Sequence, residues 1–279
     1  MKKLTTVILL FAGIGLIASC GKKATPEEEV RNYGKYFVEK INANQLDSLT
    51  ASYPDISKAD SIVPLQSDSI VVTEVAPGQF DVTLAEGVTL KVNCSDDGNI
   101  SVTESKGLFA FPDDKMDIAR KTGMWNANVS DVQLAERMND EDFFKWLNDT
   151  FEEKVSKIIT IGKFQGLPFM EGGTMGFGSQ TLTNTSDVDL DGSEYSIVAS
   201  GTYIDYGGAD GVMEEKINSV SKGYPIKAHG TKKETDVYSG HHGSVTITKI
   251  KWNLSPDQLR EKFVPYTGKE YQEYLDSKK

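Results

Sequence analysis

Three aspartates at alternate positions are the first residues in this sequence whose spacing matches a known chemistry. Asp187, Asp189 and Asp191 precede Gly192, which is the order at the start of a calcium loop, where alternate carboxylates supply oxygen ligands and glycine permits a sharp turn. The twelfth position of such a loop carries a bidentate glutamate, but here it is Val198. The missing ligand favours the alternative, a solvated acidic hairpin. We therefore predict no metal or other cofactor and keep the three aspartates as the candidate ligands if a metal does bind.

The histidines and the internal cysteine give no stronger candidate. His229, His241 and His242 fall within fourteen residues, yet neighbouring imidazoles on a turn seldom converge on one ion, and a zinc site needs at least three protein ligands. Cys94 is far from every histidine in the sequence and continues an alternating apolar pattern. We interpret Cys94 as a small buried group rather than a nucleophile, and predict no catalytic residues.

The first twenty residues have the layout of an export signal. Lys2 and Lys3 precede an apolar run that is too short for a permanent membrane span, and small residues then precede Cys20. The residues Ile17-Ala18-Ser19-Cys20 resemble the lipobox of bacterial lipoproteins. The resemblance implies removal of residues 1–19, lipid modification of Cys20 and acylation of its amino group. Several acyl chains would anchor the protein stably.

The residue after the lipidated cysteine bears on the location. Gly21 stands where lipoproteins retained at the inner membrane have Asp. The resemblance thus implies a lipid-anchored protein of the cell envelope, at the outer membrane of a Gram-negative cell and on its periplasmic or surface face. An ordinary signal peptide with a chance cysteine is the alternative.

The charge balance limits the partners. Without Lys2 and Lys3 the chain has 28 basic and 41 acidic residues, a net charge of −13. Nucleic-acid binding depends on Lys and Arg side chains that displace counterions from phosphates, so we exclude a nucleic-acid partner. The partners that we expect are the membrane, through the lipid anchor, and an envelope protein or glycan.

Two further features relate to glycans. The tripeptides around Ser48, Ser61 and Ser69 each follow an Asp-Ser-apolar pattern and resemble an acceptor motif for O-glycans on bacterial envelope proteins. Aromatic residues between 195 and 252 would suit a glycan-stacking surface if they faced solvent. A hydrolase is a third alternative, and would need two carboxylates about 5–9.5 Å apart in a cleft.

The predicted secondary structure that positions these residues alternates between helices and strands along the chain. Thr25-Pro26-Glu27-Glu28 predicts a capped helix over 26–42, and a second short helix is expected over 45–52. Four runs of alternating residues between 70 and 102, separated by turn sequences, predict an antiparallel meander. Helical spacing returns at 113–121 and at 130–157. We expect an α+β domain at 26–161, after an anchor and tether at 20–25.

Glycine-rich residues 162–178 predict a linker, and residues 179–279 predict a mainly β domain with C-terminal helices. Strands are expected at 180–184, 195–204, 225–230 and 244–254, with a bulge near Thr248-Lys249 because the apolar phase changes there.

Residues 182–186 and 203–208 resemble immunoglobulin-like modules of bacterial envelope proteins, which implies a β-sandwich. Gly201 stands where that signature has Phe. These features predict a non-catalytic envelope lipoprotein that acts as a binding or assembly module.

Overall fold

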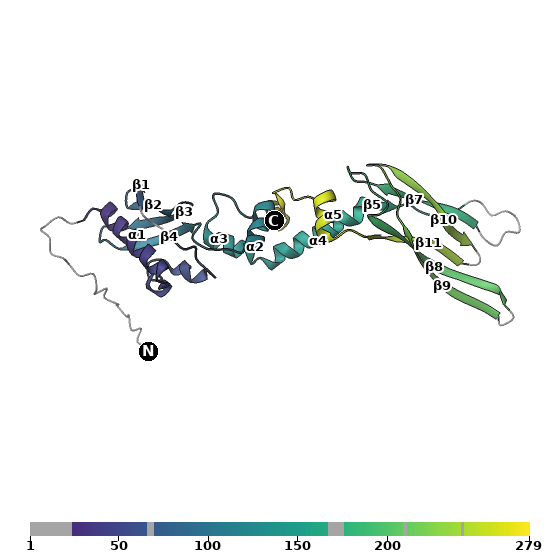
Figure 1. The fold of residues 1–279 in the computed structure, drawn as a ribbon, viewed down its shortest axis with the longest axis horizontal. Coiled ribbons are helices and arrows are strands. Elements are labelled where there is room, and N and C mark those ends of the chain that lie inside the picture. Colours follow the sequence, from purple (N-terminus) through teal and green to yellow (C-terminus); the bar gives the residue numbers. More distant parts are fainter. Residues whose placement is uncertain (1–23, 66–69, 167–175, 209–210, 241–242) are drawn as a thin grey trace. The chain divides into compact units, whose positions relative to one another are not determined.

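The computed structural model describes residues 24–65, 70–166, 176–208, 211–240 and 243–279, drawn in Figure 1. The lipobox, Ser69, His241 and His242 lie outside these residues. The chain forms two compact units. Unit 1 contains residues 1–110 with Ser130–Val132, and unit 2 contains Phe111–Val129 with Gln133–Lys279.

Unit 1 begins with helix α1 (Pro26–Asn42), which has the predicted bounds. Its capping box is formed: the Thr25 hydroxyl accepts from the Glu28 N–H at 3.3 Å, and the Glu28 carboxylate accepts from the Thr25 N–H at 2.9 Å. These bonds satisfy backbone donors that a helix start leaves without intrahelical partners. Two short 3₁₀ helices follow, η1 (Leu46–Ser48) and η2 (Pro54–Lys58), so the predicted helix over 45–52 is shorter than expected.

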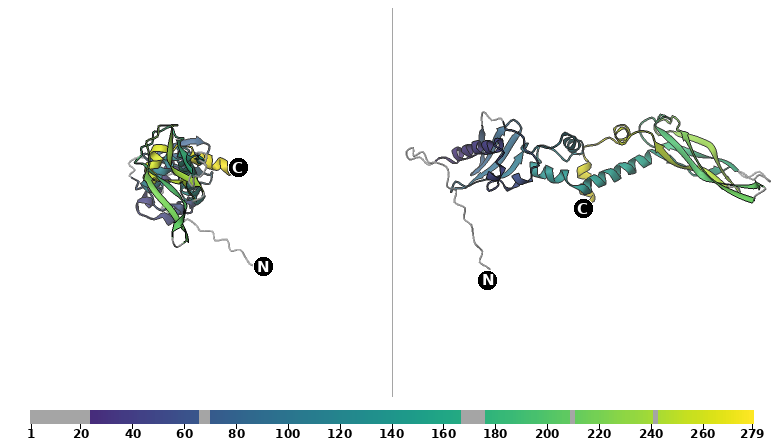
Figure 2. Two further views of the ribbon diagram at one scale, coloured as in Figure 1. Left: turned by 90° about the vertical axis from the view of Figure 1, so that its right-hand side faces the viewer. Right: turned by 60° about the horizontal axis from the view of Figure 1, so that its bottom comes forward.

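The predicted four-stranded meander is confirmed. The strands β1 (Val71–Ala76), β2 (Gln79–Ala85), β3 (Val88–Cys94) and β4 (Ile100–Lys106) pair in sequence order, all antiparallel. Apolar side chains alternate onto one face, including Val82, Leu90 and Val92, which are each 1% exposed. Figure 2 shows α1 lying along this sheet, and α1 contacts β1, β2 and β3. The opposite face is mostly polar, although Val71 of β1 is 53% exposed there.

The helices of unit 2 form their own core. They are α2 (Asp113–Lys121), α3 (Asp131–Met138, whose first two residues belong to unit 1), α4 (Glu141–Ile158), α5 (Pro256–Phe263) and α6 (Glu270–Ser277). The predicted helix over 130–157 is two helices, because the Asp140 side chain caps a new start at Glu141 by accepting from the Phe143 N–H at 3.0 Å. Phe143 is fully buried and packs edge-on against Tyr274 of α6. None of the described helices has the length and apolar character needed to cross a bilayer.

Unit 2 also contains an antiparallel sheet of seven strands. Its order is β5-β7-β10-β11-β8-β9, and β6 pairs with β7 beside β5. The bounds are β5 (Ile159–Ile161), β6 (Gln165–Gly166), β7 (Gly176–Asn184), β8 (Tyr195–Gly208), β9 (Gly211–Lys222), β10 (Thr231–Gly240) and β11 (Gly243–Trp252). Figure 1 shows β8 and β9 side by side at one edge.

Several strand predictions differ from this sheet. The strand expected at 225–230 is wrong, since only Ile226 pairs there, in an isolated bridge with Leu190. The strands β9 and β10 were not predicted, because most of the described side chains of β9 are exposed and show no apolar alternation. The bulge near Thr248 is confirmed by a register shift between Ile247 and Lys249.

The sandwich predicted for 179–279 does not match this topology, because all seven strands belong to one sheet. Gly201 shows why the Phe of the immunoglobulin-like signature has no counterpart here. A Cβ atom at this position would lie 1.7 Å from the carbonyl oxygen of Ser244 on the neighbouring strand. The backbones of β8 and β11 therefore exclude any side chain at position 201.

The boundary between the units lies at Ala110–Phe111 rather than in residues 162–178. The helices after residue 111 share a core with Tyr274 of α6, which ties them to the C-terminal part of the chain. The described residues of 162–178 contribute β6 and the start of β7 to the sheet. There a Cβ at Gly178 would meet the ring of Phe164 at 2.2 Å, so this glycine serves packing rather than linker flexibility.

The sheet has one short pairing in its interior. The ladder between β10 and β11 has three residue pairs, from Tyr238–Val245 to Gly240–Gly243. Beyond it, the buried Gln180 side chain of β7 reaches β11, where its Oε1 accepts from the Ile247 N–H at 2.6 Å. The Gln180 amide also donates to the Ile247 and Gly162 carbonyl oxygens at 3.4 and 3.2 Å. One side chain thus replaces part of a backbone ladder.

Candidate functional site

The candidate calcium loop lies in the turn after β7, and a buried asparagine organises it. The Asn184 side chain donates to the carbonyl oxygens of Val188, Lys227 and Ile226 at 2.8, 3.1 and 3.3 Å. Its Oδ1 accepts from the backbone N–H and the hydroxyl of Ser186. Asn184 is 0% exposed. This amide therefore fixes the shape of the turn from inside, and the carboxylates project from it.

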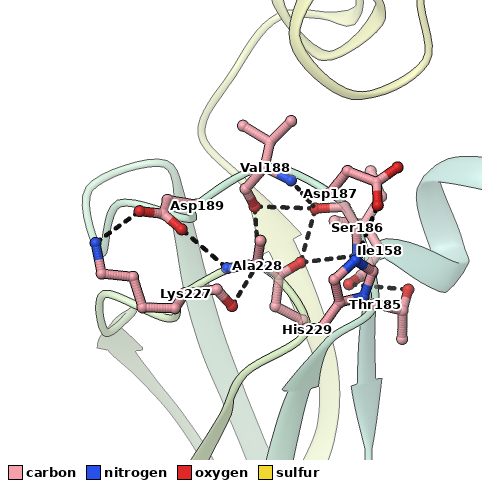
Figure 3. A network of polar contacts seen from close by, with 10 residues as sticks. Ile158, Thr185, Ser186, Asp187, Val188, Asp189, Lys227, Ala228 and His229 are labelled. Carbon is pink, nitrogen blue, oxygen red and sulfur yellow. Dashed lines mark hydrogen bonds and ion pairs between the residues drawn. The ribbon is translucent and has the colours of Figure 1, made fainter.

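Each of the three aspartates has a partner of its own. Asp187 contacts His229 Nε2 at 2.8 Å, and Asp189 binds the Lys227 ammonium at 2.7 Å and the Ala228 N–H at 2.9 Å. Figure 3 shows these two pairs on opposite sides of the turn. The third, Asp191, accepts from the Ser193 N–H and hydroxyl, both at 2.7 Å. The three carboxylates do not converge.

The electrostatics agree with this geometry. Hydrogen bonds from Lys227 and the Ala228 N–H lower the pKa of the Asp189 carboxyl, and bonds from Ser193 lower that of Asp191. Val198, at the twelfth position, is buried in β8 and offers no ligand. Among the described residues, no three His, Cys, Asp or Glu side chains come together as a metal site would need. The turn is a hydrogen-bonded acidic hairpin.

The other described sequence candidates belong to different units. Cys94, at the end of β3, is 7% exposed as its alternating pattern predicted. Its Sγ lies 3.7 Å from the Glu29 carboxylate, and burial together with that negative charge raises the pKa of the thiol. A raised pKa disfavours the thiolate that a nucleophile requires. His229 belongs to unit 2, and its side chain is 64% exposed.

Two serines of the Asp-Ser-apolar pattern are described. Ser48 is exposed at the end of η1, and its carbonyl oxygen lies 3.5 Å from the Tyr36 hydroxyl. Ser61 is also exposed, and its hydroxyl donates to the Ala110 carbonyl oxygen at 3.2 Å. Both serines lie at the surface of unit 1.

The aromatic residues proposed as a glycan platform lie mostly in the interior where they are described. Tyr195 is fully buried, and Tyr224 and Trp252 pack against the same apolar cluster. The Tyr195 hydroxyl donates to the Tyr224 carbonyl oxygen at 2.8 Å. These rings are positioned by the sheet to fill its core.

A buried carboxylate in unit 1 was not anticipated from the sequence. Asp131, 4% exposed, accepts from the Ser105 hydroxyl at 2.6 Å and from the backbone N–H groups of Gly107, Leu108 and Phe109 at 2.8–3.3 Å. Since Ser105 donates its single proton to the carboxylate, the Tyr53 hydroxyl at 2.8 Å must donate to Ser105. Burial raises the pKa of Tyr53 to about 12. Asp131 holds the chain that leaves β4.

The polar face of the meander has a hollow of about 330 Å³. Thr73, Asp81, Lys91 and Glu104 stand opposite one another across its four strands. Glu104 pairs with Lys91 at 2.9 Å and with Lys106 at 3.4 Å. Burial alone would raise the pKa of the Glu104 carboxyl, but the two lysines lower it overall. Lys91 and Lys106 therefore share one carboxylate, that of Glu104.

The chain matches no protein-family model, and no curated protein is significantly similar to it.

Proposed function

We propose that this protein is a lipid-anchored binding protein of the bacterial cell envelope, with its lipid on Cys20. The observation that carries the proposal is the pattern at the start of the chain, where an apolar run ends in Ile17-Ala18-Ser19-Cys20. The capped start of α1 adds support, because its N-cap, Thr25, stands only five residues after Cys20 in the sequence. Such a short tether suits a folded body held close to its anchor.

A binding role fits the polar groups better than catalysis does. The carboxylates of the turn after β7, and the buried Asp131, already have cationic or N–H partners within the chain. A general base or a nucleophile needs a partner group that the substrate can reach. The resemblance of residues 182–208 to immunoglobulin-like envelope modules also favours an adhesive or structural role, at the level of sequence alone.

A glycan ligand is the second candidate, and an observation other than the aromatic residues favours it. On the face that they share with Ser196 and Ser200 of β8, strands β9 and β11 carry exposed lysines, together with hydroxyl groups.

Metabolic labelling with a palmitate analogue tests the anchor. Wild-type protein should incorporate the label, and Cys20→Ala should lose it and be released from the membrane fraction. A Cys94→Ala variant is the matched control and should be labelled like the wild type. Equal labelling of the Cys20→Ala variant would overturn the proposal.

A further inference from the structure

One face of the seven-stranded sheet carries a set of exposed lysines, which we call the lysine face: Lys216 and Lys222 of β9 and Lys249 and Lys251 of β11. The register places Lys222, Lys249 and Lys251 close together, and Lys216 lies further along β9 on the same face. Ser196 of β8 stands between Lys222 and Lys251, and Val198 stands between Val220 and Lys249. Strands lie about 4.8 Å apart, so Lys222 and Lys251 are attached roughly 10 Å from each other.

The opposite face of β8 and β11 is the core. Ile197 of β8 stands opposite Ile250, and Ala199 stands opposite Ile247, which is 4% exposed. Because side chains alternate along a strand, the lysines must point away from this core. The bulge near Thr248 shifts the register by one residue, and the outer face of β11 therefore continues from Lys249 to Thr246. Thr246 stands opposite Ser200 of β8.

The positive charges of this face are not neutralised within the described chain. None of the four lysines has a carboxylate within ion-pair distance among the described residues, although Lys222 contributes to the lowered pKa of Asp191. The chain as a whole carries a formal net charge of −11. At physiological salt a charge is screened over about 8 Å, so a local cationic face still attracts an anion.

The neighbouring side chains indicate which kind of anion. Hydroxyl and amide groups of Ser196, Ser200, Asn218, Thr246 and Thr248 are interspersed with the lysines, and the Ser200 and Thr248 hydroxyls lie 2.9 Å apart. Among the described side chains of β9, the large apolar one exposed on this face is Val220, which is 63% exposed. Protein interfaces are depleted in lysine and rich in aromatic residues, and membrane-surface segments insert larger apolar groups. A hydrated ligand with repeated negative charges fits better.

We propose that the lysine face binds an anionic polysaccharide, a polymer with carboxylates or phosphates along its length. Ammonium groups on two strands would pair with successive charges, and the hydroxyl groups between them would hydrogen-bond to the sugar. The proposal deepens the binding role proposed above but does not need the lipid anchor. Labelling of Cys20 and polysaccharide binding are therefore separate tests.

The test uses the full mature chain in a neutral detergent and polygalacturonate as the probe. We expect binding at low salt, weaker binding at high salt, and no binding to the same polymer after full methyl esterification, which removes its charges. The triple variant Lys222→Gln/Lys249→Gln/Lys251→Gln should lose about tenfold in affinity, as removal of several exposed ion pairs implies. Lys→Arg changes at the same three positions keep the charge and should keep the binding.

A matched control removes the same charge elsewhere in unit 2. Lys115, Lys145 and Lys154 are exposed on α2 and α4, and their triple change to Gln should leave affinity within twofold, roughly the effect of distant screened charges. An equal loss in both triple variants would overturn the proposal, as would absence of binding by the wild type. Equal or tighter binding to double-stranded DNA, or to vesicles of phosphatidylcholine and phosphatidylglycerol in equal parts, would also overturn it.

Discussion

The two antiparallel sheets of this protein use charge in opposite ways. In the meander, a buried carboxylate (Asp131) holds the chain after β4, and the exposed lysines of the outer face share Glu104. In the seven-stranded sheet, a neutral amide (Asn184) holds the turn after β7, and the lysine face has no carboxylate at ion-pair distance among the described residues.

The difference separates charges that serve the fold from charges left for a ligand. A cation paired within its own sheet gains little from an external anion, because it must give up one partner for another. A cation without such a partner keeps its full attraction for a ligand. The meander face is therefore a solvated surface, and the lysine face is the one that we expect to bind.

The largest expected effect comes from Asp131→Ala. The change leaves the Ser105 hydroxyl and three backbone N–H groups without their buried acceptor, and should destabilise unit 1 by about 3–5 kcal/mol. Urea unfolding followed by far-UV circular dichroism measures the loss. Ser105→Ala removes one donor and should cost about 1 kcal/mol. A stability of Asp131→Ala equal to that of Ser105→Ala would show that the carboxylate does not hold this chain segment.

A smaller effect is expected from Asn184→Ala in the other sheet. Three carbonyl oxygens and two donors of Ser186 would lose a neutral partner, at a cost of about 2 kcal/mol. Tryptophan fluorescence reports the unfolding in urea, because all three tryptophans, Trp125, Trp146 and Trp252, belong to unit 2. Asn253→Ala is the control, since this asparagine is exposed and bonds to Ser193 and Ser196 at the surface. If both variants lost the same stability, burial of Asn184 would not matter.

The smallest effect is expected from Glu104→Gln, which removes the carboxylate that the lysines of the meander share. Loss of an exposed ion pair should cost less than about 1 kcal/mol. The lysines lower the pKa of Glu104 in the folded state, so its contribution is present above the unfolded value of about 4.3 and is lost as the pH falls through the folded value. The stability difference between wild type and variant, followed by urea unfolding, should therefore disappear at acidic pH.

The same variant also has a binding readout. Without Glu104, Lys91 and Lys106 lose the carboxylate that they share, and the meander face should gain about threefold in affinity for polygalacturonate. The gain is best measured in the lysine-face triple variant, where the stronger site is removed. An unchanged affinity would mean that pairing within a sheet does not decide which face binds.

The sequence predicts the elements whose signals are local. The capping residue Thr25 places α1, and turn sequences with alternating residues place the meander. The phase change around Thr248 is also visible in the sequence. Strand β9 is not, because an edge strand exposed on both faces needs no apolar pattern.

The candidate sites show the same limit. The aspartates of 187–191 have a calcium-like spacing, but their partners Lys227 and His229 are about forty residues away in sequence, so pairing depends on the fold. Asp131 and Ser105 are likewise brought together by tertiary structure. The sequence shows only part of the lysine face, because Lys249 and Lys251 alternate within one strand. The pairing of β8 with both β11 and β9 adds the lysines of β9.

The short ladder between β10 and β11 has a mechanical consequence. Within the sheet, β9, β8 and β11 are joined to β10 and β7 by three residue pairs and the side chain of Gln180. The pairing of β8 with β9 runs along nearly the whole of both strands and spreads a load over many more bonds. Under pulling, the sheet would therefore part between β10 and β11 before the ligand-bearing hairpin opened.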